Sequence, residues 1–151
     1  PNEKPNLQEI HKHFAVNLFN ETWDLLDKTE RSHEETLLMI HKAHASLYHW
    51  LQIGTPNEFC IGAWQLARVY SVANMPESAL VHAQRCLTIC KENEMKGFNL
   101  AYAYEAMARA YHLAGNAAEF EHYYQLAKSE SAAITEEASR KMLLDDLQTI
   151  K

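Results

Sequence analysis

The feature that most constrains this chain is an internal repeat. The segment Ala67-Arg68-Val69-Tyr70 aligns with Ala108-Arg109-Ala110-Tyr111 at an offset of 41 residues, and the same shift pairs two further identical positions, Ala73 with Ala114 and Gln84 with Gln125. A repeat of about 20–50 residues built from helix pairs is typical of a solenoid, in which each unit buries its apolar face against the next. The repeat therefore favours stacked helical units.

Helix-start signals recur along the chain and set the number of helices. Asn6, Ser32 and Thr55 are each followed by Glu three residues later, which is the pattern of a capping box. Only 4 Gly and 4 Pro occur in 151 residues, too few for the many tight turns of an all-β protein. We expect an all-α fold of about seven helices, at residues 7–28, 33–54, 56–73, 76–96, 100–114, 117–130 and 136–150. Asn99 is the expected cap of the fifth helix.

The links between these helices are short, so neighbouring helices should run antiparallel. No low-complexity segment or linker divides the chain, which predicts a single domain over residues 1–151. Within it we expect an N-terminal helical hairpin at 6–54, two repeat units at 55–96 and 97–131, and a capping helix at 135–150. The additional length of the repeat falls at residues 91–96 and predicts a longer second helix in the first unit.

The two repeat units resemble the tetratricopeptide repeat (TPR) family. Its pattern combines Leu, small and aromatic positions in the first helix with small and aromatic positions in the second. The matching residues are Ala63, Leu66, Ala67, Tyr70, Ala79, Leu80 and Leu87 in one unit, and Tyr104, Met107, Ala108, Tyr111, Gly115, Tyr124 and Ala127 in the other. Phe120 and Ala83 depart from it, and the period exceeds the usual 34 residues or so. The resemblance implies a TPR-like right-handed superhelix, an α-α solenoid.

The resemblance also implies a binding face. In TPR-like proteins the first helix of each pair lines a concave groove that holds a peptide or a segment of a partner protein. The positions implied here are Trp64, Arg68, Glu105, Arg109 and His112. Two guanidinium groups would suit an acidic tail or a small dianion. Alternatively, Glu105 pairs with Arg109 four residues later, and Arg68 reaches a carboxylate on another helix as an internal contact.

The nine histidines support a second functional hypothesis. His44, His49 and His82, together with the two arginines, would form a closed pocket for a small anionic ligand or a metal ion. A zinc site requires three or four ligands, and no such set is evident from the spacing. We therefore predict no metal site and no cofactor. His44 and His82 lie among apolar neighbours and are candidates for a buried polar network with Arg68 and Glu105.

Charge and cysteine content narrow the function classes. The formal net charge is −6 and the longest basic runs are dipeptides, which argues against nucleic-acid binding. Cys60, Cys86 and Cys90 are expected to be buried, reduced thiols, as in a cytoplasmic protein. The polar stretch at residues 1–5 lacks the apolar region of a signal peptide, and no apolar run would span a membrane. No catalytic motif is present, so we lean against an enzyme.

Two recognisable units are fewer than the three or so that usually make a stable array. The N-terminal hairpin and the last helix must then cap the array, or a homodimer covers the exposed end. The candidate dimer surface is the outward face of the last helix, with Met142, Leu143 and Ile150. The expected partners are therefore a protein or peptide segment and, as an alternative, a second copy of the chain.

Overall fold

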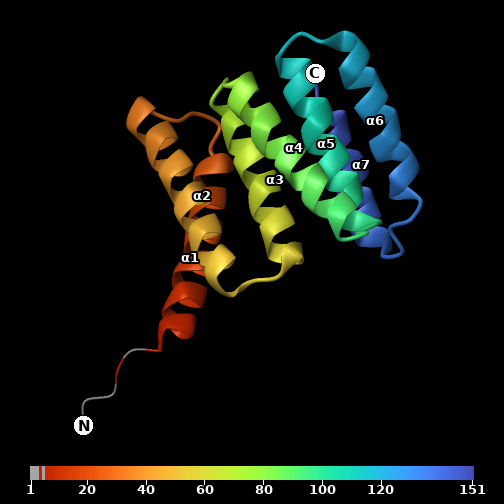
Figure 1. The fold of residues 1–151 in the computed structure, drawn as a ribbon. Helices are drawn as coiled ribbons and strands as arrows, with labels where there is room; N and C mark the ends of the chain where they lie inside the picture. The colour runs from red at the N-terminus through yellow and green to blue at the C-terminus, as the bar shows by residue number, and fades with distance from the viewer. Residues whose placement is uncertain (1–3, 5) are drawn as a thin grey trace.

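A computed structural model describes residue 4 and residues 6–151, and in this part of the chain it contains helices and no strand (Figure 1). The prediction about a signal peptide rests largely on residues 1–3 and 5, which lie outside the described residues. The helices are α1 (Leu7–Leu26), α2 (His33–Ile53), α3 (Pro56–Val72), α4 (Pro76–Glu92), α5 (Phe98–Leu113), α6 (Ala117–Ser131) and α7 (Glu137–Gln148). The all-α prediction and the number of helices are confirmed.

Consecutive helices pack as pairs, α1 with α2, α3 with α4 and α5 with α6. The pairs follow one another across the molecule in chain order, and α7 lies behind α5 at the C-terminal end (Figure 1). The first helices of the pairs also contact one another, since α3 packs on both α1 and α5, and α5 packs on α7. One side of the molecule is therefore built from α1, α3, α5 and α7.

The helix starts follow the capping signals in the sequence. Ser32 accepts a hydrogen bond from the Glu35 amide at 3.1 Å, and the Glu35 carboxylate accepts one from the Ser32 amide at 3.0 Å, which completes a capping box. Asn6 accepts from the Gln8 amide at 3.0 Å. Pro56 and Pro76 occupy the first turns of α3 and α4, where a missing N–H leaves no helical hydrogen bond unmade.

The link between α4 and α5 differs from the prediction. Helix α4 ends at Glu92 and is as long as α3, at 17 residues each. The extra length of the repeat therefore lies in the link between α4 and α5 and not in a longer helix. Asn99 is not the cap of α5, because Gly97, at φ 70°, is the N-cap two residues earlier. The Asn99 side chain instead donates a hydrogen bond to Asn57 at 2.8 Å.

Small residues fill the contacts between the helices. The buried alanines of α3 and α5 let neighbouring helices approach closely, because no larger side chain separates them: Ala63, Ala67, Ala101, Ala103, Ala106, Ala108 and Ala110.

The outward dimer surface expected on the last helix is wrong for two of its three residues. Leu143 and Ile150 are buried in the core, and of the three only Met142 is exposed. Among the described residues, no helix has the length and apolar character needed to cross a membrane.

The Gly97 turn gives a first prediction. At φ 70° and ψ −127° the backbone is in a region that L side chains rarely adopt, and an added Cβ would lie 3.1 Å from the Ala133 carbonyl oxygen. Gly97→Ala should lower the free energy of unfolding by about 1–3 kcal/mol, measured by urea denaturation. The control is Gly115→Ala, also at positive φ but with no atom within 4 Å of its added Cβ. Equal losses in the two variants would contradict the contact argument.

Candidate functional site

The two repeat-related arginines meet on one buried carboxylate. Arg68 of α3 donates to Oε1 of Glu105 at 2.9 Å, and Nε of Arg109 lies 3.5 Å from the same oxygen. Glu105 is completely buried on α5. The two guanidinium groups thus point to the same side and lie closer together than the spacing of about 10 Å expected for adjacent packed helices. Both internal contacts that the sequence left open, one within α5 and one between helices, are present.

The last helix extends this network. Asp146 of α7 accepts a hydrogen bond from the Tyr102 hydroxyl at 2.6 Å, and its second oxygen lies 3.8 Å from Arg68. Arg109 donates to the Asp146 backbone carbonyl at 3.0 Å and to the Thr149 hydroxyl at 2.9 Å. Side chains of α3, α5 and α7 are therefore joined through two cations and two carboxylates.

The electrostatic environments of the two arginines differ. Burial acts to lower the pKa of Arg68, but the Glu105 and Asp146 carboxylates outweigh burial and raise it. For Arg109 burial dominates and lowers the pKa, although Glu105 opposes this effect. Nε of each arginine and Oε2 of Glu105 are buried and have no hydrogen-bond partner within the described part of the chain. The charges of the network are therefore balanced largely by ion pairs within the protein.

The outer edges of both guanidinium groups border a surface pocket of about 210 Å³. His112 lies at this pocket, is exposed, and packs its ring against Phe120 with centroids 4.9 Å apart. The structure thus brings Arg68, Arg109 and His112 together.

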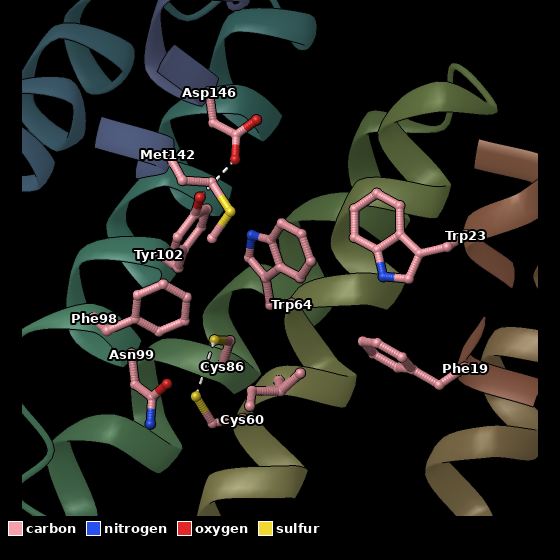
Figure 2. A pocket seen from close by; sticks show the side chains of 11 residues that line it. Phe19, Trp23, Cys60, Trp64, Cys86, Phe98, Asn99, Tyr102, Met142 and Asp146 are labelled. Atoms are coloured by element: carbon pink, nitrogen blue, oxygen red, sulfur yellow. Dashed lines mark hydrogen bonds between the residues drawn. The ribbon is translucent and has the colours of Figure 1, made fainter. Parts of the chain in front are cut away.

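Trp64 belongs to a neighbouring cavity of about 220 Å³ (Figure 2). Its ring lies between Trp23 of α1 and Tyr102 of α5, with centroid distances of 5.7 and 5.3 Å. The Arg68 guanidinium carbon lies 5.4 Å from the centroid of the Trp64 ring, which connects the cavity to the charged network. The remaining lining residues are mostly apolar or aromatic: Phe19, Cys60, Ile61, Cys86, Phe98, Asn99, Met142 and Asp146.

A second pocket, of about 140 Å³, adjoins this cavity. The two share Phe19 and Ile61, and the second is completed by Val16, Asn20, Trp50 and Glu58. Together they form a two-pocket apolar surface across α1, α2, α3, α5 and α7. We call this surface the aromatic groove.

The predicted histidines form two separate groups. His44 is 2.7 Å from the Tyr70 hydroxyl, and the His82 ring stacks on the Tyr70 ring at 5.3 Å with the planes 3° apart. His49 instead contacts His11, with 2.8 Å between their Nδ1 atoms. Among the described residues, the hydrogen bonds and ring contacts of His44, His49 and His82 include none with Arg68, Glu105 or Arg109. The structure thus places these histidines and the arginines in different clusters.

Sequence reasoning missed most of the aromatic groove. On four of its helices, α1, α3, α5 and α7, lining residues recur four positions apart, as Phe19 and Trp23, Cys60 and Trp64, Phe98 and Tyr102, and Met142 and Asp146. A spacing of four places two side chains on the same helix face, so this pattern was a readable signal. Which four helices share one face is decided by packing.

The buried network predicts a large effect of removing its carboxylate charge. Glu105→Gln leaves two buried cations without their common partner, so the free energy of unfolding should fall by about 3–5 kcal/mol in denaturant titration. The control is Asp145→Asn, which breaks the exposed pair with Lys141 and should cost less than about 1 kcal/mol. If the two losses were similar, the network would not be the main tie between α3, α5 and α7.

The Tyr70 cluster predicts sensitivity to acid. Burial is the main cause that lowers the pKa of both His44 and His82, and a second charge adds to it, that of His41 at His44 and that of His44 at His82. The unfolded chain therefore takes up protons first as the pH falls, so the folded state loses stability from about pH 7 to pH 5. His82→Phe keeps a ring on Tyr70 and should make this loss smaller, measured as urea midpoints at several pH values. His122→Phe, which replaces an exposed histidine, should leave the slope unchanged; equal slopes in wild type and His82→Phe would refute the assignment.

No protein-family model matches the chain, and no match was found among curated proteins or among solved structures. The function is therefore argued from the arrangement of the side chains.

Proposed function

We propose that this protein is a TPR-like interaction module that binds a segment of a partner protein in the aromatic groove. The observation that carries the proposal is the cavity of about 220 Å³ around Trp64, which lies where α1, α3, α5 and α7 meet. Clefts lined by aromatic side chains with a few polar groups are typical binding sites. The cavity has room for one apolar side chain of a bound segment.

The neighbouring pocket suggests a second anchor. Because the two pockets share Phe19 and Ile61, two apolar side chains of one peptide can occupy both pockets at once. Met142 is 49% exposed at the edge of the cavity, where a partner would cover it. Anchoring by a few buried apolar side chains is the usual source of affinity in peptide recognition.

The charges around the groove favour a basic partner. Among the described residues, the charged lining residues are Glu58 and Asp146, both acidic, of which Asp146 already faces Arg68. The formal net charge of the chain is −6. Complementary charge speeds association and selects partners more than it adds affinity. The proposed ligand is therefore a peptide segment with two apolar anchors flanked by Lys or Arg.

The small-anion alternative is weaker. Arg68 and Arg109 would have to hold the anion, but their charges already face Glu105 and Asp146 inside the protein. The histidines that would complete a closed pocket lie in other clusters. We therefore assign the arginine pair to the internal network.

A peptide-display selection tests the proposal. A random 12-residue library should converge on peptides with apolar residues beside Lys or Arg, and fluorescence anisotropy then gives their affinity. Met142→Lys adds a charge at the edge of the cavity and should weaken binding about tenfold or more. Val81→Lys is the matched control, because Val81 is 65% exposed on α4, away from the groove.

The selection also has outcomes that would overturn the proposal. Failure of the library to converge, or equal affinity of the selected peptides for the two lysine variants, would show that the groove does not bind peptides. Urea midpoints for both variants establish that each is folded during the measurement.

A further inference from the structure

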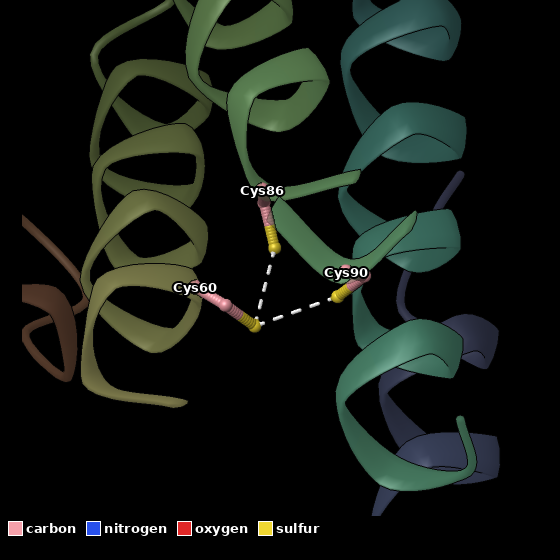
Figure 3. A group of neighbouring side chains, drawn as sticks. All are labelled: Cys60, Cys86 and Cys90. Carbon is pink, nitrogen blue, oxygen red and sulfur yellow. Dashed lines mark hydrogen bonds between the residues drawn. The ribbon is translucent and has the colours of Figure 1, made fainter. Parts of the chain in front are cut away.

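Three cysteines from two helices meet in the core beside the aromatic groove. The side chains of Cys60 on α3 and of Cys86 and Cys90 on α4 point to a common point between the helices (Figure 3). Each is at most 2% exposed, and none forms a disulfide. The sequence placed Cys86 and Cys90 on one helix face but gave no indication that Cys60 joins them.

The sulfur positions fit coordination of a single metal or metalloid centre. The Sγ atoms of Cys60 and Cys90 are 3.6 Å apart, those of Cys60 and Cys86 are 3.9 Å apart, and all three lie within 4.8 Å of one another. A metal–sulfur bond of about 2.3 Å places three sulfurs in a trigonal arrangement about 4 Å apart. The observed triangle therefore requires only small side-chain adjustments to take up such a centre.

The number of ligands is three. Within residue 4 and residues 6–151, no further His, Cys, Asp or Glu ligand atom joins the group of three sulfurs. Structural zinc sites use four protein ligands, which is one more than this cluster supplies. Thiolate ligands are preferred by soft metal ions as a class. The composition of the cluster therefore favours a centre that is satisfied by three sulfurs.

The thiols already share their protons. The Cys86 thiol donates to the sulfur of Cys60, and the hydrogen bond between Cys60 and Cys90 lowers the pKa of Cys90. Hydrogen bonding to Cys60, together with burial, raises the pKa of Cys86. The three thiols are thus linked by hydrogen bonds, and the thiolate is the form that coordinates a metal.

The sulfurs can be reached from two sides. Cys60 and Cys86 line the cavity around Trp64, where they lie near Phe98 and Asn99 (Figure 2). Cys90 lines a separate surface pocket with Lys91, Met95 and Tyr104. A small solute in either pocket therefore needs local side-chain movement to reach the buried sulfurs, and a working site needs such an entry path in addition to ligand geometry.

We propose that Cys60, Cys86 and Cys90 form a three-sulfur site for a soft, thiophilic metal or metalloid centre that takes three ligands. Trivalent arsenic is the member of this class that best suits the location. Three thiolates neutralise its charge of +3, whereas Zn²⁺ with three thiolates leaves a net negative charge in the core, where an uncompensated charge is costly. This proposal does not rest on the proposed peptide binding.

The binding reaction with arsenous acid balances without an oxidant or a reductant. Each of three As–O bonds is replaced by an As–S bond, and each hydroxyl leaves as water with one proton. The three protons come from the thiols of Cys60, Cys86 and Cys90. Arsenic stays trivalent and the product is neutral.

Titration of the reduced protein with arsenite tests the site. Native mass spectrometry should show one arsenic per chain with loss of all three hydroxyl groups, and the melting temperature should rise because the ligand binds only the folded state. Loss of even an outer-shell partner costs about 10–100-fold in metal affinity, so Cys60→Ser, Cys86→Ser and Cys90→Ser should each weaken binding at least about tenfold.

Two controls keep the result interpretable. Circular dichroism melts of the serine variants without arsenite establish that they fold, and Val81→Lys, which retains all three sulfurs and lies on the exposed face of α4, should bind arsenite as wild type does. The proposal is overturned if arsenite keeps a hydroxyl group on the wild-type protein, or if folded serine variants bind it equally well. It is also overturned if binding requires denaturant.

Discussion

The C-terminal half of this fold depends on the ion pairs that the buried Glu105 carboxylate forms with Arg68 and Arg109. Glu105 lies on α5, receives Arg68 from α3 and Arg109 from its own helix, and is completely shielded from solvent. A lone buried charge is unfavourable, so α3 and α5 must pack with their cations in place for the carboxylate to be tolerated. Asp146 then joins α7 to the same cluster.

The aromatic groove and the thiol cluster both follow from this arrangement. Once α3 and α5 are held side by side, Trp64 of α3 packs against Tyr102 of α5, and the cavity forms in front of them. Behind Trp64, the small residues Ala63 and Ala83 share one core with the three cysteines, so α3 and α4 approach closely enough for their sulfurs to meet. One packing solution thus places two chemically different sites beside each other.

Local signals accounted for the helices but not for all of their ends. Ser32 and Asn6 cap helices as predicted, because a cap depends on residues within a few positions of one another. Asn99 was misassigned because the positive φ of Gly97 starts α5 earlier, and the extra residues of the first unit form a link. The sequence also offered a Glu105–Arg109 pair and a carboxylate partner for Arg68 on another helix, but not that one carboxylate serves both arginines.

By itself, the sequence determined the all-α class, the pairing of consecutive helices and the burial of the cysteines, since these depend on capping, short links and apolar spacing. Only the tertiary structure decided which distant residues meet: Cys60 with Cys90, Tyr102 with Asp146, and Phe19 with Trp64 around one cavity. The physical reason is that spacing along a helix fixes which face a residue occupies. Which face of another helix it meets depends on the close packing of all the side chains between them.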